Sequence, residues 1–145
     1  MSLSNPTSKM SKSDKDTGGT IYIMEKPEDI MRSFKRAVTD SDTVVRYDAE
    51  NKPGISNLMQ IYSAASGKSF SEIESEFEGR GYGDFKPAVG EAVIEMLRPI
   101  REEAERLLAD KVYLEGVYRA GAEKASYVAL KTLRKVYKKV GFIQR

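Results

Sequence analysis

The side chains best suited to chemistry lie near the N-terminus, in the run Lys9-Met10-Ser11-Lys12-Ser13. The chain has no histidine and no cysteine. The usual proton carrier at neutral pH, the thiolate nucleophile and the cysteine metal site are therefore all excluded. Chemistry must rest on lysine, arginine, carboxylates, hydroxyls or backbone amides. These groups favour the stabilisation of negative charge, or simple binding, over hydrolysis or metal catalysis.

A second group of basic residues lies at the other end of the chain. Residues 130–145 carry six lysines and arginines and no acid, whereas residues 66–110 carry six basic and eleven acidic residues. On a helical wheel Leu133, Val136 and Val140 define one face, and the opposite face carries Lys131, Arg134, Lys135 and Lys138. This basic stripe is typical of a surface that attracts a polyanion, although a merely solvated helix face gives the same pattern.

Hydrophobic periodicity predicts the elements that position these two groups. Residues 1–20 lack periodicity and are expected to form a loop, and short extended runs are expected at 21–23 and 44–47. Proline, capping and glycine signals then predict five helices. We expect an all-α bundle of about five helices behind a flexible N-terminal arm. The first helix is expected to start at Pro27, with Ile30, Met31, Phe34, Ala37 and Val38 on its apolar face, and the second to lie around Leu58. The third is expected to start at a capping box of Ser69 and Glu72, the fourth to be capped by Asp84, and the fifth to span about 111–140.

Two charged or glycine-rich stretches have simple structural interpretations. The run Gly79–Gly83 lies between helices rather than after a strand, so we expect a turn and not a phosphate-binding loop. A cluster of charges is expected to pair within itself, although its basic members could also contact a polyanion. It comprises Arg32, Lys35, Arg36, Arg46, Asp40, Asp42 and Asp48.

The sequence resembles one enzyme family along most of its length. Residues 9–13 form the KMSKS motif of class I aminoacyl-tRNA synthetases. Further stretches resemble the C-terminal half of bacterial tryptophanyl-tRNA synthetases, more closely than the related tyrosyl enzymes. These stretches are AVTDSDTVVRYD at 37–48, KPGISNLMQIYSAASG at 52–67, EFEGRGYGDFK at 76–86 and LRPIREEAE at 97–105. The resemblance runs in order from about Asn5 to the end.

The resemblance implies a role in the activation of tryptophan by ATP, with Mg²⁺ bound through the nucleotide. Lys9 and Lys12 would be the catalytic residues, acting on the β- and γ-phosphates, and Met10, Ser11 and Ser13 would complete the ATP-binding loop. The attacking carboxylate is already ionised, so the difficulty is the charge that gathers on the leaving pyrophosphate. Two lysines on a mobile loop suit that task.

The resemblance also implies a division of the chain and its partners. Residues 1–20 would be the KMSKS segment of a catalytic domain, and residues 21–145 a helical domain that binds the anticodon end of tRNA. The basic stripe on residues 131–138 would contact tRNA phosphates. The HIGH-like motif and the βαβ pattern are missing, so we expect the chain alone to be inactive. The parent enzyme is expected to be a homodimer through the missing half.

The sequence also leaves two other interpretations open. The chain could instead be a free-standing helical RNA-binding module, or a protein-interaction bundle that uses its acidic middle. Salt-sensitive tRNA binding would separate these two alternatives. No apolar run approaches the length of a membrane span, and the N-terminus has no hydrophobic signal core. We therefore expect a cytoplasmic protein with no membrane partner.

Overall fold

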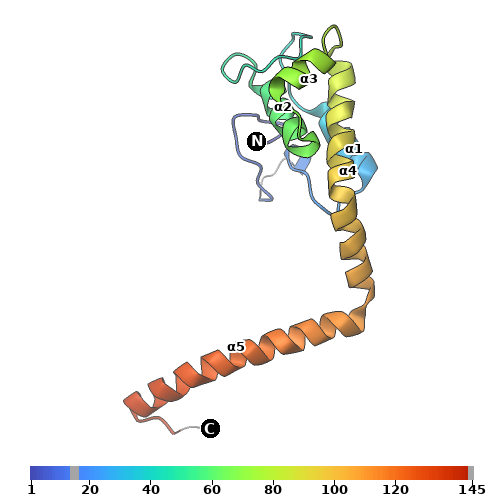
Figure 1. Ribbon diagram of the computed structural model, residues 1–145. Coiled ribbons are helices and arrows are strands. Elements are labelled where there is room, and N and C mark those ends of the chain that lie inside the picture. Colours follow the sequence, from blue (N-terminus) through green and yellow to red (C-terminus); the bar gives the residue numbers. More distant parts are fainter. Residues whose placement is uncertain (14–16, 144–145) are drawn as a thin grey trace. The chain divides into compact units, whose positions relative to one another are not determined.

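The computed structural model describes residues 1–13 and 17–143 (Figure 1). Part of the expected N-terminal loop, residues 14–16, and the last basic residue, Arg145, lie outside the described residues. Within those residues the chain forms five α-helices and no strand, which confirms the all-α prediction. The chain divides into two compact units, Met1–Arg101 and Glu102–Arg145.

The first unit begins its helical part with α1, Pro27–Arg36. Proline is in the first turn, followed by Glu28 and Asp29, whose charges favour the positive end of the helix dipole. Ile30 and Phe34 point into the core and are almost completely buried. Helix α1 ends before Ala37, so Val38, expected on its apolar face, lies beyond the helix and is half exposed.

Helices α2, Pro53–Ser66, and α3, Phe70–Glu76, follow the signals in the sequence. Helix α2 ends at Gly67, which adopts the left-handed conformation with φ of 77°. The predicted capping box of α3 is confirmed, because the Ser69 hydroxyl accepts from the Glu72 amide and the Glu72 carboxylate accepts from the Ser69 amide. These caps fix where each helix starts and stops.

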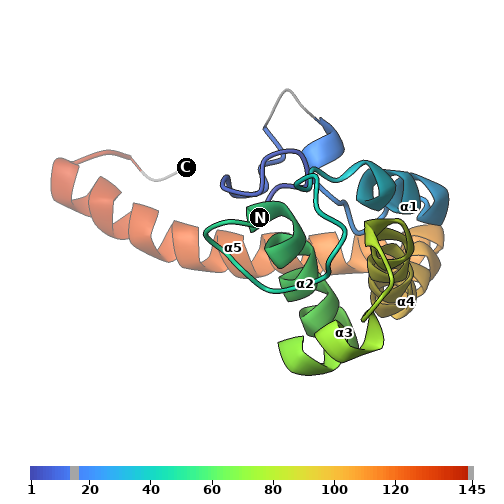
Figure 2. The same cartoon turned by 90° about the horizontal axis from the view of Figure 1, so that it is seen from above.

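Helix α4, Tyr82–Ala109, carries much of the core of the first unit. Phe85 packs edge-to-face against Phe77 and Tyr62, with ring centroids 4.9 and 5.7 Å away, which joins α2, the end of α3 and α4. Gly90 faces the Met31 side chain of α1, and Figure 2 shows α1 and α2 beside α4. The predicted cap Asp84 lies instead in the first turn, because α4 starts two residues earlier.

The N-terminal segment belongs to the core of the first unit. Leu3 is only 1% exposed, and its amide donates to the Gly19 carbonyl at 3.0 Å. The Val38 amide donates to the Leu3 carbonyl at 2.8 Å, and the Met1 ammonium donates to Asn57 of α2 at 2.8 Å. The compact units divide after Arg101 rather than at residue 20, and the assignment of the two predicted domains stays a prediction.

The second unit contains the end of α4 and helix α5, Lys111–Val140. The Asp110 carboxylate accepts from the Tyr113 amide at 2.9 Å, and Gly141 ends the helix with φ of 75°. The predicted bounds of 111–140 are therefore confirmed. None of the residues of α5 is buried. No helix among the described residues is both long and apolar enough to cross a membrane.

Candidate functional site

The KMSKS loop exposes its two predicted catalytic lysines. Lys9 and Lys12 both lie on the surface, whereas Met10 between them packs partly against the core. The Ser11 hydroxyl accepts from the Ser13 amide at 3.3 Å, and the Ser11 carbonyl accepts from the Thr20 hydroxyl at 3.3 Å. The loop thus carries two ammonium groups in solvent on a backbone held by short local bonds.

The base of this loop is closed by a tight contact at Gly19. Gly19 ends the short 3-10 helix η1, Thr17–Gly19, and is buried against Ser2 and Ser4. A Cβ atom at Gly19 would overlap both of their hydroxyl oxygens. The Ser2 amide donates to the Ser8 carbonyl at 2.8 Å. The ends of the loop are therefore fixed on the helical unit, while the lysine side chains extend from it.

The basic stripe lies on α5 in the second unit. Its four predicted residues, Lys131, Arg134, Lys135 and Lys138, are all exposed. Lys131 and Arg134 also line a shallow hollow of about 320 Å³ with Leu130 and with Tyr127, which is 72% exposed. Cations beside an exposed aromatic ring can contact phosphates and stack against a base. The surface is chemically suited to a nucleic acid.

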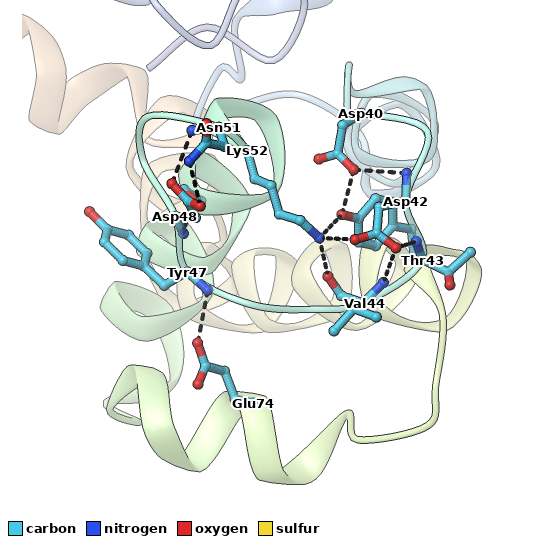
Figure 3. Close-up of polar contacts among 11 residues, drawn as sticks. Asp40, Asp42, Thr43, Val44, Tyr47, Asp48, Asn51, Lys52 and Glu74 are labelled. Atoms are coloured by element: carbon cyan, nitrogen blue, oxygen red, sulfur yellow. Dashed lines mark hydrogen bonds and ion pairs between the residues drawn. The ribbon is translucent and has the colours of Figure 1, made fainter.

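A buried lysine that the sequence analysis did not single out organises the loop before α2. Lys52 is 8% exposed, and Figure 3 shows its ammonium group inside a ring of oxygen atoms. It forms an ion pair with Asp42 and donates to the Val44 carbonyl at 3.1 Å and to the Tyr82 hydroxyl at 3.4 Å. The Tyr82 hydroxyl donates in turn to Asp40 at 2.9 Å.

The pKa shifts of Asp42 and Tyr82 in this network fit a structural role. Hydrogen bonds from Lys52, then from the Thr43 and Val44 amides, lower the pKa of Asp42 to about 2. Burial, followed by the bond to Asp40, raises the pKa of Tyr82 above its ordinary value. Asp42 therefore stays ionised and Tyr82 stays protonated at neutral pH. The network holds the segment in place.

The ion pairs of the charged cluster join its members to residues outside it, whereas within the cluster Arg46, after the hydrogen bonds from Asn51, helps to lower the pKa of Asp48. Arg32 pairs with Asp29 inside α1 at 2.7 Å, and Asp42 pairs with Lys52 rather than with an arginine. Asp48 accepts from the Asn51 amide and side chain, both at 2.9 Å. The sequence offered one signal for the pairing of Lys52. This lysine directly precedes Pro53, the first residue of α2, and lies close in sequence to the loop that holds Asp40 and Asp42.

A comparison with known protein families identifies the class to which this chain belongs. The family model described as "tRNA synthetases class I (W and Y)" matches residues 1–98. The chain therefore belongs to this family. The match covers the KMSKS loop, α1 to α3 and most of α4, and it agrees with the predicted resemblance.

Among members of this class, the similar sequences and structures are named for tryptophan. The chain is 50% identical over 143 residues to a tryptophan–tRNA ligase of Clostridium tetani, covering 99% of the chain and 42% of that relative. It is 47% identical over 145 residues to one of Bacillus anthracis, covering 100% and 44%. Tryptophanyl-tRNA synthetase structures from Mycoplasma pneumoniae and Campylobacter jejuni match with TM-scores of 0.70 and 0.75, each at 28% identity.

The matches include nearly all of this chain but less than half of each relative. The two structural matches include 99% and 98% of this chain but only 43% and 44% of theirs. The chain thus spans less than half the length of the relatives that it matches. All four relatives are named for the same amino acid and the same class of reaction.

Proposed function

We propose that this chain is the C-terminal portion of an enzyme that uses ATP to activate tryptophan and attaches it to tRNA. The observation that carries the proposal is the 50% identity, over nearly the whole chain, to a tryptophan–tRNA ligase. In such an enzyme this portion supplies the KMSKS loop and a helical domain that binds tRNA. The catalytic sheet and the tryptophan pocket belong to the remainder, so the chain alone is inactive.

Lys9 and Lys12 act on the triphosphate of ATP in this proposal. Their exposed ammonium groups, on a loop fixed at its base by Gly19, fit a ligand that carries several negative charges. Bound ATP with Mg²⁺ supplies the phosphoryl electrophile and the leaving pyrophosphate. Lys12, aided by Lys9, stabilises charge on that leaving group. Ser11 and Ser13 offer hydroxyl or amide donors to ATP, and the backbone at Met10 lies near the adenine.

The α5 stripe contacts the tRNA backbone in the same proposal. Lys131, Arg134, Lys135 and Lys138 provide cations for phosphates, which position the RNA without reading its sequence. The complete enzyme acts in the cytoplasm as a homodimer joined through the part that this chain lacks. The location and the homodimer are inferred from the family and belong to this proposal.

The proposal is tested by the kinetics of a complete enzyme that contains this segment. Lys12→Ala should lower the rate of tryptophan-dependent ATP–pyrophosphate exchange by about 100-fold or more, as expected when a group that stabilises developing charge is lost. The dissociation constant of tryptophan should stay unchanged. Lys26→Ala, an exposed lysine outside the loop, is the matched control. Equal losses in exchange rate and tryptophan binding would contradict a role in the transition state.

Filter binding of tRNA by this chain tests the contribution of the stripe. Reversal of two charges, Arg134→Glu with Lys138→Glu, should weaken binding and flatten its salt dependence, because fewer counterions are released. The conservative pair Arg134→Lys with Lys138→Arg should retain both. Cognate and non-cognate tRNA should be affected alike. Unchanged binding by the charge-reversed chain at every salt concentration would make the stripe a solvated face.

A further inference from the structure

Asn57 is a buried polar residue of α2 that neither predicted site includes. It lies in the first half of the helix, and only 4% of it is exposed. A buried side-chain amide is costly to the fold unless its donors and its acceptor have partners. The partners of Asn57 therefore show which part of the chain this position holds.

The side chain of Asn57 bonds to the first two residues of the chain. Its amide nitrogen donates to the Ser2 carbonyl at 3.2 Å and to the Met1 carbonyl at 3.3 Å. Its oxygen accepts from the Met1 nitrogen at 2.8 Å. That nitrogen is a donor both as an ammonium group and as a peptide N–H, so the contact does not need a free N-terminus. One side chain of α2 thus holds the backbone of residues 1–2 by three bonds.

The hydrogen bonds continue from Ser2 to the first lysine of the KMSKS loop. The Ser2 amide donates to the Ser8 carbonyl at 2.8 Å, and Ser8 directly precedes Lys9. The Asn5 amide donates to the Ser2 hydroxyl at 3.4 Å, and the Ser8 amide donates to the Asn5 carbonyl at 2.9 Å. Because these bonds close the turn between Ser2 and Ser8, a displacement of Ser2 also displaces Lys9.

Backbone contacts hold the same segment at Leu3. Its carbonyl accepts from the Val38 amide at 2.8 Å, and its amide donates to the Gly19 carbonyl at 3.0 Å. These contacts use groups that every residue except proline carries. The bonds from Asn57, in contrast, need a side chain with both a donor and an acceptor at one position of α2. Asn57 therefore makes the position of the loop base depend on the identity of one side chain.

We propose that Asn57 is a positioning residue for the activation step, because it fixes the base of the KMSKS loop on α2 and so places Lys12 against the leaving pyrophosphate. The inference rests on the proposed function, which gives the loop its substrate. Asn57 itself touches no substrate and acts through the loop. A misplacement of about 1 Å can lower a rate by about 100-fold, whereas the affinity for tryptophan depends on a pocket in the remainder of the enzyme.

The test is tryptophan-dependent ATP–pyrophosphate exchange by a complete enzyme that contains this segment. Asn57→Asp keeps the shape of the side chain but loses both of its donated hydrogen bonds. It should lower kcat by about tenfold or more and leave the dissociation constant of tryptophan unchanged. Ser56→Ala is the matched control, because Ser56 is 2% exposed and its hydroxyl accepts from the Asp48 amide at 2.9 Å, in a different segment. It should keep the kcat of the unmodified enzyme.

A double-mutant cycle separates positioning from a general loss of stability. If Asn57 acts through Lys12, Asn57→Asp should lower kcat by less than about threefold in an enzyme that already carries Lys12→Ala. A general loss of stability would lower kcat by the same factor in both backgrounds. Gly19→Ala disturbs the loop base from another side, since its Cβ atom would overlap the Ser2 hydroxyl. It should show the same non-additivity with Lys12→Ala, which keeps the inference testable even where Asn57→Asp fails to fold.

The inference is overturned by an unchanged kcat in Asn57→Asp, by equal losses in the two backgrounds, or by a loss of the same size in Ser56→Ala. If Lys12→Ala still lowers the exchange rate in these cases, the proposed function stands and only the role of Asn57 is wrong. If Lys12→Ala leaves the exchange rate unchanged, the proposed role of the KMSKS lysines fails as well. Unchanged far-ultraviolet circular dichroism of each variant excludes misfolding.

Discussion

The two units of the molecule differ in whether the apolar faces of their helices are buried. In Met1–Arg101 such faces close over a core that contains all sixteen buried hydrophobic residues of the described chain. In Glu102–Arg145 the periodicity is just as clear, yet Leu133, Val136 and Val140 are 41–56% exposed and no residue of α5 is buried. Periodicity therefore identifies a helix and its apolar face, but it does not identify what covers that face.

One ion pair of the first unit differs from the exposed pairs found in both units. The Lys52–Asp42 pair in the first unit has a buried lysine that also bonds a carbonyl and a hydroxyl group. The pairs of the second unit, Arg106–Glu103 and Arg119–Glu115, are between exposed side chains one turn apart. Exposed pairs of this kind contribute little to stability. The Lys52–Asp42 pair holds a loop in the first unit, whereas the Arg106–Glu103 and Arg119–Glu115 pairs remain on the surface of the second.

The largest expected contrast is in side-chain truncation. Phe85→Ala should destabilise the first unit by about 3–5 kcal/mol, because it removes a ring with no exposed surface and leaves a cavity. Leu133→Ala on α5 should change stability by less than about 0.5 kcal/mol, because the leucine is 41% exposed. Native-state amide exchange reports each unit separately. Equal effects would mean that α5 is packed in solution.

A pair of glycine substitutions should give effects of opposite sign. A Cβ atom at Gly54 would overlap the Val38 carbonyl oxygen and lie 2.8 Å from the Thr39 Cα. Gly54→Ala should therefore cost about 1–3 kcal/mol. At Gly116 in α5 a Cβ atom meets nothing within 4 Å, so Gly116→Ala should stabilise its helix by up to about 1 kcal/mol. Urea unfolding followed by circular dichroism measures both, and a neutral Gly54→Ala would show that the loop can move aside.

The smallest effect is the pH dependence of the loop that Lys52 holds. The folded pKa of Asp42, about 2, lies below its ordinary value of 3.8. Its ionised form therefore adds stability that is complete above about pH 4 and is lost as the pH falls towards 2. Asp42→Asn should flatten the acid limb of stability over that range. Carbon-13 titration of Asp42 should also show its pKa rising in Lys52→Met, since Lys52 is the first cause of the shift. An unchanged pKa would contradict the pairing.

Local signals in the sequence determined the helices. Pro27, the Ser69–Glu72 capping box and the glycines at 67 and 141 act on backbone groups only a few residues away, so they place helix ends without knowledge of the fold. The absence of histidine and cysteine also limited the available chemistry, and the KMSKS run located the candidate loop. These conclusions needed no tertiary information.

Tertiary packing decided the remaining features, because they join residues far apart in the chain. Leu3 enters the core, and the Met1 ammonium meets Asn57 across 56 positions. Lys52 bonds the Tyr82 hydroxyl across 30 positions, and segment 43–46 and the turn at 77–81 line the same groove. No local pattern encodes such contacts. They depend on which surfaces α1 to α4 leave open once their apolar faces have packed together.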